Sequence, residues 1–158
     1  MGAESTPGGF SPGALEAYID GSSRGNPGPG AGAAVIFDGR KIVARKGKYL
    51  ERCTNNQAEY TALLLALETA LLMGCTSLTV KTDSQLVARQ IGGSYKVKNR
   101  NILPLYLEAV KLIGRFREFA VVEIPREENT LADRLTALVI ARHRHGKPAS
   151  GGASAAAD

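Results

Sequence analysis

The sequence predicts an α/β fold, with a mixed five-stranded sheet flanked by helices. Near the N-terminus, three segments rich in small and β-branched residues are joined by short turns, which favours antiparallel pairing. Further along, strand-like segments alternate with helical ones. A helical crossover between neighbouring strands requires parallel pairing and a right-handed connection. One sheet with both kinds of pairing follows.

The first three strands are expected over 15–20, 30–37 and 41–49. GSSRGNPGPG between the first two is a Gly/Pro turn region, and Asp38-Gly39 fits the positive φ angles of a type I′ hairpin turn. Beyond them, we expect a helix over 57–73, a strand over 77–82, a short helix to 91, a helix over 101–116, a strand over 120–124 and a last helix to 144.

The 158 residues suit one domain. We expect the folded part over 14–145, between a disordered lead over 1–13 and a disordered tail over 146–158, both rich in Gly, Ser, Pro or Ala. No apolar run approaches the roughly 20 residues of a membrane span, and the N-terminus lacks a signal-peptide pattern, so we expect a cytoplasmic location. No obligate protein partner is evident in the sequence, and we expect a monomer. Cys53 and Cys75 are expected to be reduced thiols, although a bridge between them stays open.

Four carboxylates form the candidate site. Asp20 and Asp83 each end a predicted strand, whereas Glu59 and Asp133 each lie in the first turn of a predicted helix. Each alone is also a plausible cap or turn residue. If the first and fourth strands are parallel neighbours, however, Asp20 and Asp83 leave the same carboxyl edge of the sheet, where open α/β sheets bind ligands.

Converging carboxylates repel one another unless divalent cations neutralise them. Oxygen ligands select Mg²⁺ or Mn²⁺ over zinc, and two such ions roughly 4 Å apart can support phosphodiester hydrolysis. The net charge of +5 and the pI near 9.4 favour a polyanionic partner, although this signal is weak by itself. Together these features predict a metal-dependent nuclease.

Four sequence blocks, IDGSSRGNPGPGAGAAVI, CTNNQAEYTALLLAL, VKTDSQLV and PREENTLADRLT, closely resemble the active-site blocks of type 1 ribonuclease H. They occur in the right order and cover about residues 15–142. The resemblance implies the ribonuclease H-like fold, with strand order 3-2-1-4-5. It also implies two Mg²⁺ ions per site, with Mn²⁺ as a substitute, and cleavage of the RNA strand of RNA/DNA hybrids to 3′-hydroxyl and 5′-phosphate ends.

By this resemblance, Asp20 would bridge the two metals, and Glu59 and Asp83 would hold the ion beside the leaving 3′ oxygen. Asp133 would help to hold the ion that delivers water. Gly21 would let RNA approach the backbone closely. The residues that match hybrid-contacting positions are Gly21, Ser22, Asn26, Asn55, Asn56 and Gln85. A turn at 26–27 and a helix cap at Asn56 are the structural alternatives.

The sequence departs from the best-known bacterial pattern in two places. The loop before Asp133 has no histidine, so Arg126, Glu127 or Glu128 would substitute for it, and slower turnover is expected. The long basic handle is also missing. In its place GGSYKVKNRN offers Lys96, Lys98 and Arg100 for DNA-strand phosphates, unless it is a solvated loop.

Alternative functions remain open at this point. A related nuclease that also cuts double-stranded RNA fits the missing handle, and a non-catalytic hybrid-binding module fits the fold. The presence of all four acids argues against the second alternative. A DNA transposase or junction-cleaving relative is disfavoured, because the DGS…GNPG and TNNQAEY blocks match the RNA-cutting branch.

Overall fold

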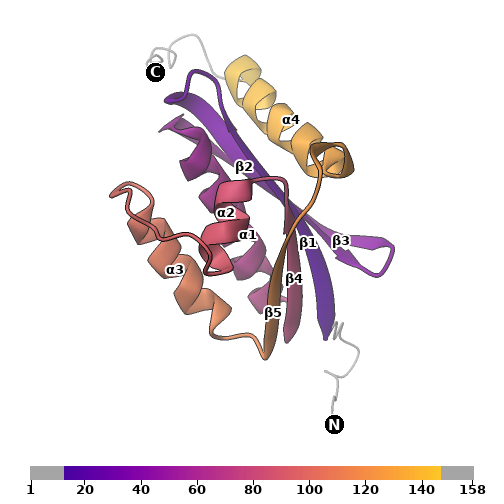
Figure 1. Cartoon of the computed structure of the whole chain (residues 1–158). Helices are drawn as coiled ribbons and strands as arrows, with labels where there is room; N and C mark the ends of the chain where they lie inside the picture. Colours follow the sequence, from indigo (N-terminus) through magenta and orange to yellow (C-terminus); the bar gives the residue numbers. More distant parts are fainter. Residues whose placement is uncertain (1–12, 147–158) are drawn as a thin grey trace.

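The computed structural model describes residues 13–146, which form one sheet and its covering helices (Figure 1). In chain order the elements are β1 (Ala14–Ser23), β2 (Gly28–Asp38), β3 (Lys41–Cys53), α1 (Asn55–Leu72), β4 (Ser77–Thr82), α2 (Gln85–Ile91), α3 (Leu103–Ile113), β5 (Glu118–Glu123), the 3₁₀ turn η1 (Arg126–Glu128) and α4 (Thr130–Gly146). Residues 1–12 and 147–158 lie outside the described part, so the expected lead and tail stay predictions, except that Gly146 ends α4.

The strand order is β3-β2-β1-β4-β5, which confirms the order that the resemblance implied. β1 pairs with β2, and β2 with β3, in antiparallel fashion, whereas β4 pairs in parallel with both β1 and β5. The β1–β4 ladder runs from Ala14 opposite Ser77 to Ile19 opposite Thr82. β1 is therefore the strand at which the antiparallel and parallel parts of the sheet meet.

Four strands differ from their predicted bounds. β2 is longer at both ends, and β3 continues past residue 49 to Cys53, which pairs with Gly28. β1 does not end at Asp20 but continues to Ser23, which pairs with Gly30. The local sequence of the Gly/Pro-rich segment predicts a turn throughout. Its second half nevertheless belongs to β2, because it pairs with the extended end of β1. β5 begins at Glu118 instead of residue 120, since Glu118 pairs with Ser77 of β4.

The ends of two helices also differ from the prediction. α3 is shorter than expected and ends at Ile113, with Gly114 as its C-cap residue. α1 begins two residues early, because Thr54 forms a capping box with Gln57. The possible helix cap at Asn56 is therefore wrong.

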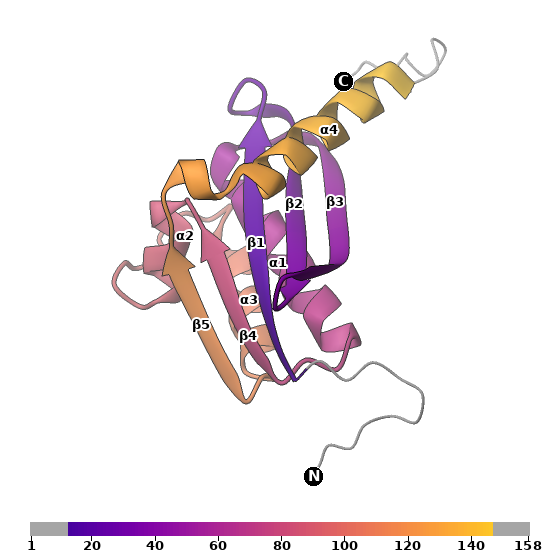
Figure 2. The ribbon, with the colours of Figure 1, turned by 90° about the vertical axis from the view of Figure 1, so that its right-hand side faces the viewer.

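The helices lie on both faces of the sheet, and Figure 2 shows α4 on the face opposite α1 and α3. The main core lies between α1 and the sheet, where Ile19, Ile36, Leu63 and Leu67 are fully buried. Cys53 and Cys75 are buried free thiols, as expected. None of the helices in the described range is long and apolar enough to cross a membrane.

Candidate active site

A pair of glycines brings α1 onto the sheet beside Asp20. Gly21 of β1 and Gly32 of β2 are cross-strand partners, and both face the first turns of α1. A Cβ on Gly32 would lie 2.7 Å from the backbone nitrogen of Ala62, and a Cβ on Gly21 would overlap the backbone of Ala58 and Glu59. The helix can therefore touch the strands, which places Glu59 next to β1.

Asp20 and Asp83 occupy equivalent positions at the end of the parallel ladder. Its last pair joins Ile19 and Thr82, so each aspartate is the next residue of its own strand or turn. One carboxylate oxygen from each of Asp20, Glu59 and Asp83 lies within 4.8 Å of the others. Three residues that are 24 to 63 positions apart in the chain therefore share one small volume.

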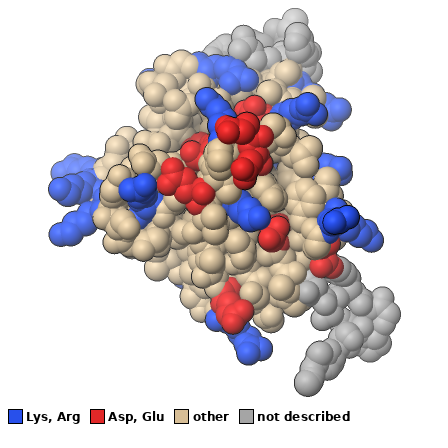
Figure 3. All heavy atoms as spheres, turned by 45° about the vertical axis from the view of Figure 1, so that its right-hand side comes forward, with Lys and Arg blue, Asp and Glu red and all other residues tan. Residues whose placement is uncertain are grey.

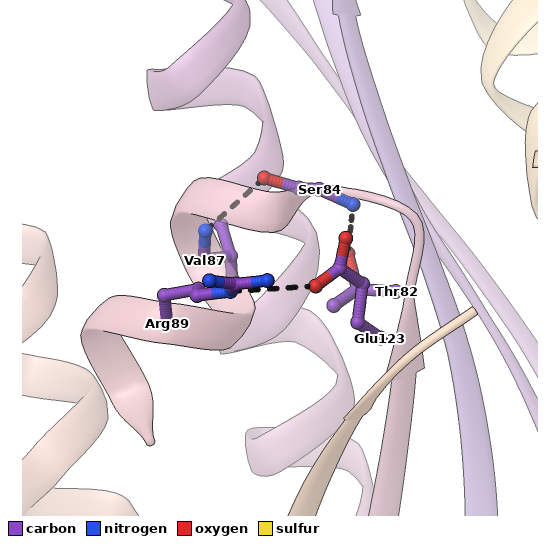
Figure 4. A network of polar contacts seen from close by, with 5 residues as sticks. All are labelled: Thr82, Ser84, Val87, Arg89 and Glu123. Carbon is purple, nitrogen blue, oxygen red and sulfur yellow. Dashed lines mark hydrogen bonds and ion pairs between the residues drawn. The ribbon is translucent and has the colours of Figure 1, made fainter. Parts of the chain in front are cut away.

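The corner that carries Asp83 is braced on both sides (Figure 4). The Ser84 N–H donates to Thr82 Oγ1 at 3.0 Å, and Ser84 Oγ accepts from the Val87 N–H at 3.1 Å, which caps α2. Below them, Arg89 of α2 forms an ion pair at 3.6 Å with Glu123 of β5. Strand β4, helix α2 and strand β5 are thereby linked around the turn, which fixes the backbone of Asp83.

Burial makes negative charge costly in this cluster. Asp20 is 4% exposed, and desolvation together with the neighbouring Asp83 carboxylate raises its pKa from 3.8 to about 6. Desolvation also raises the pKa of Glu59 well above its usual value, and the charges of Asp20 and Asp83 add to that shift. In the absence of a cation, both acids are therefore harder to ionise than a carboxyl group in water.

Two oxygens of the cluster have no hydrogen-bond partner. Asp20 Oδ2 and Glu59 Oε1 are buried and unpaired, an arrangement that proteins rarely retain without a function. Buried carboxylate oxygens that converge without donors suit a hard divalent cation, which prefers oxygen ligands. The residues present therefore fit the metal that the sequence predicts.

The cluster opens into a cavity of about 390 Å³. Asp133, in the first turn of α4, is exposed on its wall but does not belong to the group within 4.8 Å. On the face in Figure 3, acidic side chains gather in the upper half, with Lys and Arg side chains around them. The complete lining is Asp20, Gly21, Ser22, Asn55, Glu59, Asp83, Ser84, Arg126 and Asp133.

The predicted substrate contacts lie at different places relative to this cavity. Ser22 and Asn55 line it, and Asn55 is held there because its Oδ1 accepts the Ser23 N–H at 2.8 Å. Asn26 braces the same corner, since its Oδ1 accepts the Asn55 N–H at 2.9 Å. The other predicted contacts are exposed and do not line the cavity: Asn56, Gln85, Lys96 and Lys98.

The structure requires a glycine at position 21 for a different reason from the one predicted. The space that its missing side chain leaves is filled by the backbone of α1, rather than left open for RNA. In the loop before α4, Arg126 lines the cavity, whereas Glu128 lines a separate hollow beside Tyr18 and Phe37. Of the two loop residues, only Arg126 lies where a histidine substitute would have to act.

Asn129, which the sequence alone did not single out, is 1% exposed and lies behind the cluster. Its Nδ2 donates to the Ile19 carbonyl at 2.8 Å and to Asp83 Oδ2 at 3.3 Å. An Asn just before a predicted helix is an ordinary helix-cap residue, so its type alone does not indicate a site. The sequence did contain one indication that Asn129 lies near the site. It precedes Asp133 by four residues, which is about one helical turn.

Comparison with known proteins gives the family. Residues 18–139 match the family model described as reverse transcriptase-like. The structure of RNase H1 from Halobacterium salinarum is similar, with a TM-score of 0.76 and 40% identity over 79% of this chain and 96% of that one. The chain belongs to the type 1 ribonuclease H family. The expected ribonuclease H-like fold is thereby confirmed.

Two further ribonucleases H are similar. The N-terminal RNase H domain of Rv2228c from Mycobacterium tuberculosis has a TM-score of 0.81 and 36% identity, over 85% of this chain and 99% of that one. The full-length relative is the bifunctional protein Rv2228c, to which the chain is 42% identical in sequence. The match covers 73% of this chain but only 32% of that relative. LC11-RNase H1, solved in complex with an RNA/DNA hybrid, has a TM-score of 0.77 and 34% identity, over 81% of this chain and 97% of that one.

Proposed function

We propose that this ribonuclease H hydrolyses the RNA strand of RNA/DNA hybrids and leaves 3′-hydroxyl and 5′-phosphate ends. The observation that carries the proposal is the convergence of Asp20, Glu59 and Asp83, two of which present buried oxygens without partners. The hybrid bound to the similar LC11-RNase H1 supports the choice of substrate. All four acids come from one chain, so the site needs no acid from a second copy, and we propose a monomer in the cytoplasm.

Each acid has a proposed role in the site. Asp20, at the centre of the cluster, would be a ligand of both ions, while Glu59 and Asp83 would hold the one beside the leaving oxygen. Asp133, on the cavity wall, would help to hold the other. When bound, two Mg²⁺ ions, or Mn²⁺ in their place, supply an activated water and stabilise the leaving oxygen.

Other residues on the cavity wall would position the substrate. Ser22 and Asn55 offer polar groups beside the acids, and Asn26 keeps the Asn55 backbone in place. Gly21, Asn56 and Gln85 are proposed to contact the hybrid from around this opening. Glu59 would lie near the RNA 2′-hydroxyl, the group that distinguishes RNA from DNA.

Arg126 would partly substitute for the missing loop histidine. Its positive charge lowers the pKa of both Asp20 and Glu59, although desolvation outweighs that effect. A guanidinium cannot exchange protons near neutral pH, so Arg126 can attract phosphate but cannot act as a general base. Turnover slower than that of a histidine-bearing relative follows.

The test is cleavage of labelled RNA/DNA, RNA/RNA and DNA/DNA duplexes with Mg²⁺ or Mn²⁺. The wild type should cut the RNA strand of the hybrid, and both Asp20→Asn and added chelator should abolish the cleavage. Asp38→Asn is the matched control, because Asp38 lies in the β2–β3 hairpin and Asn-Gly suits that turn equally well. Equal cleavage of RNA/RNA would support the broader nuclease, and binding without cleavage would support a silent module.

A further inference from the structure

Asn129 forms hydrogen bonds to Asp83, to the backbone next to Asp20 and to the backbone of Asp133. Its Nδ2 donates to the carbonyl of Ile19, the residue before Asp20, and to the carboxylate of Asp83 itself. Its own carbonyl accepts the Asp133 N–H at 3.1 Å, at the start of α4. One buried side chain with its backbone therefore links strand β1, the end of β4 and helix α4 directly behind the cluster.

The orientation of this amide is determined by its partners. Both are acceptors, so the NH₂ group must face them, with one hydrogen for each. Asn129 Oδ1 then points elsewhere, and it is buried without a partner. An unpaired buried carbonyl destabilises the folded state, which a residue needed only for packing would avoid. The contacts made by the NH₂ group are the feature that the site requires.

We propose that Asn129 is a positioning residue for metal binding. Its amide holds one carboxylate oxygen of Asp83 and leaves the other for a cation, while its bond to Ile19 fixes the distance between β1 and that carboxylate. Partners behind a ligating carboxylate orient it and commonly affect metal affinity as strongly as a weak ligand does. The inference deepens the proposed function and rests on it.

A purely structural role is the competing explanation, and Tyr60 provides the comparison. Tyr60 on α1 is fully buried, and its hydroxyl donates to Gln90 Oε1 of α2 at 2.7 Å. It therefore also joins two elements through a buried side-chain hydrogen bond, but its hydrogen-bond partner is an amide and not a carboxylate. Tyr60→Phe removes a structural link of the same kind and keeps the aromatic ring.

The experiment measures the Mn²⁺ dissociation constant by electron paramagnetic resonance on the full chain, together with unfolding free energy, kcat and KM. The variants are Asn129→Leu, which keeps the branched shape of the side chain without its polar groups, Asn129→Ala, and Tyr60→Phe. Both Asn129 variants should weaken Mn²⁺ binding about 10-fold or more and lower kcat with little change in KM. Tyr60→Phe should lose stability, because Gln90 loses its buried partner, while its Mn²⁺ affinity stays at the wild-type value.

Three results would overturn the inference: unchanged Mn²⁺ affinity in Asn129→Leu, an equal loss of affinity in Tyr60→Phe, or failure of both Asn129 variants to fold while Tyr60→Phe folds. The last result would assign Asn129 to the fold alone. A wild type that neither binds Mn²⁺ nor cleaves the hybrid would instead overturn the proposed function. The two failures are therefore distinguishable.

Discussion

Gly21 of β1 lies directly against the backbone of Ala58 in the first turn of α1, with no room for a Cβ between them. Gly21→Ala must therefore push α1 away from the sheet and carry Glu59 with it. Such overpacking costs roughly 1–3 kcal/mol of unfolding free energy, and we expect hybrid cleavage to fall by a larger factor than stability alone explains. Urea unfolding and single-turnover cleavage measure the two effects.

Gly114→Ala is the matched control for that variant. A Cβ there would lie at an ordinary distance of 3.5 Å from the Lys111 carbonyl, at the end of a helix far from the acids in sequence. It should leave cleavage unchanged. Full activity in Gly21→Ala would show that the close approach of α1 is not required.

The metal-free protein should lose stability as pH rises through the range in which Asp20 titrates. Well below pH 3.8 the carboxyl is protonated in both states. Between 3.8 and about 6 the unfolded chain releases its proton while the folded chain keeps it, so the folded state is progressively disfavoured. The shift corresponds to about 3 kcal/mol above pH 6. Urea unfolding in chelator should show this decline, and Asp20→Asn should reduce it.

Saturating Mg²⁺ should reverse that decline, because a bound cation favours the ionised carboxylates. The rise in Tm on adding Mg²⁺ is therefore expected to be larger at pH 8 than at pH 5. Equal rises at both pH values would indicate that the cation binds away from Asp20 and Glu59.

Glu59→Gln should separate metal binding from folding. Because burial already holds the pKa of Glu59 well above its usual value, a neutral amide should not lower the stability of the metal-free protein. The same variant should lose the Mg²⁺-induced rise in Tm and the cleavage activity. Glu68→Gln on the exposed side of α1 is the control, and it should keep both.

The loop that replaces the basic handle is predicted to contact DNA-strand phosphates. Replacing Lys96, Lys98 and Arg100 with Ala should reduce the slope of log affinity against log salt by about 1 for each phosphate that is no longer neutralised. Binding to hybrid can be followed by fluorescence anisotropy in Ca²⁺, without turnover. A control replaces three exposed β3 lysines, Lys41, Lys46 and Lys48. Equal slopes in the two triple variants would contradict the assignment.

The sequence predicted the element order because turn signals and helix periodicity are local properties. Strand bounds were less accurate, since the extension of β1 to Ser23 depends on pairing with Gly30 across a turn. Asp20 and Asp83 could be placed at one edge from the predicted parallel pairing. Asn129 could not be found in that way, because its function depends on contacts with Ile19 and Asp83, 110 and 46 residues away.

The most direct test of the two-cation proposal is anomalous X-ray diffraction from crystals of the protein soaked in Mn²⁺. Two anomalous peaks among Asp20, Glu59, Asp83 and Asp133 are expected in the presence of hybrid, and both should disappear in Asp20→Asn. Peaks located only away from these side chains, in a crystal of active enzyme, would contradict the proposed chemistry.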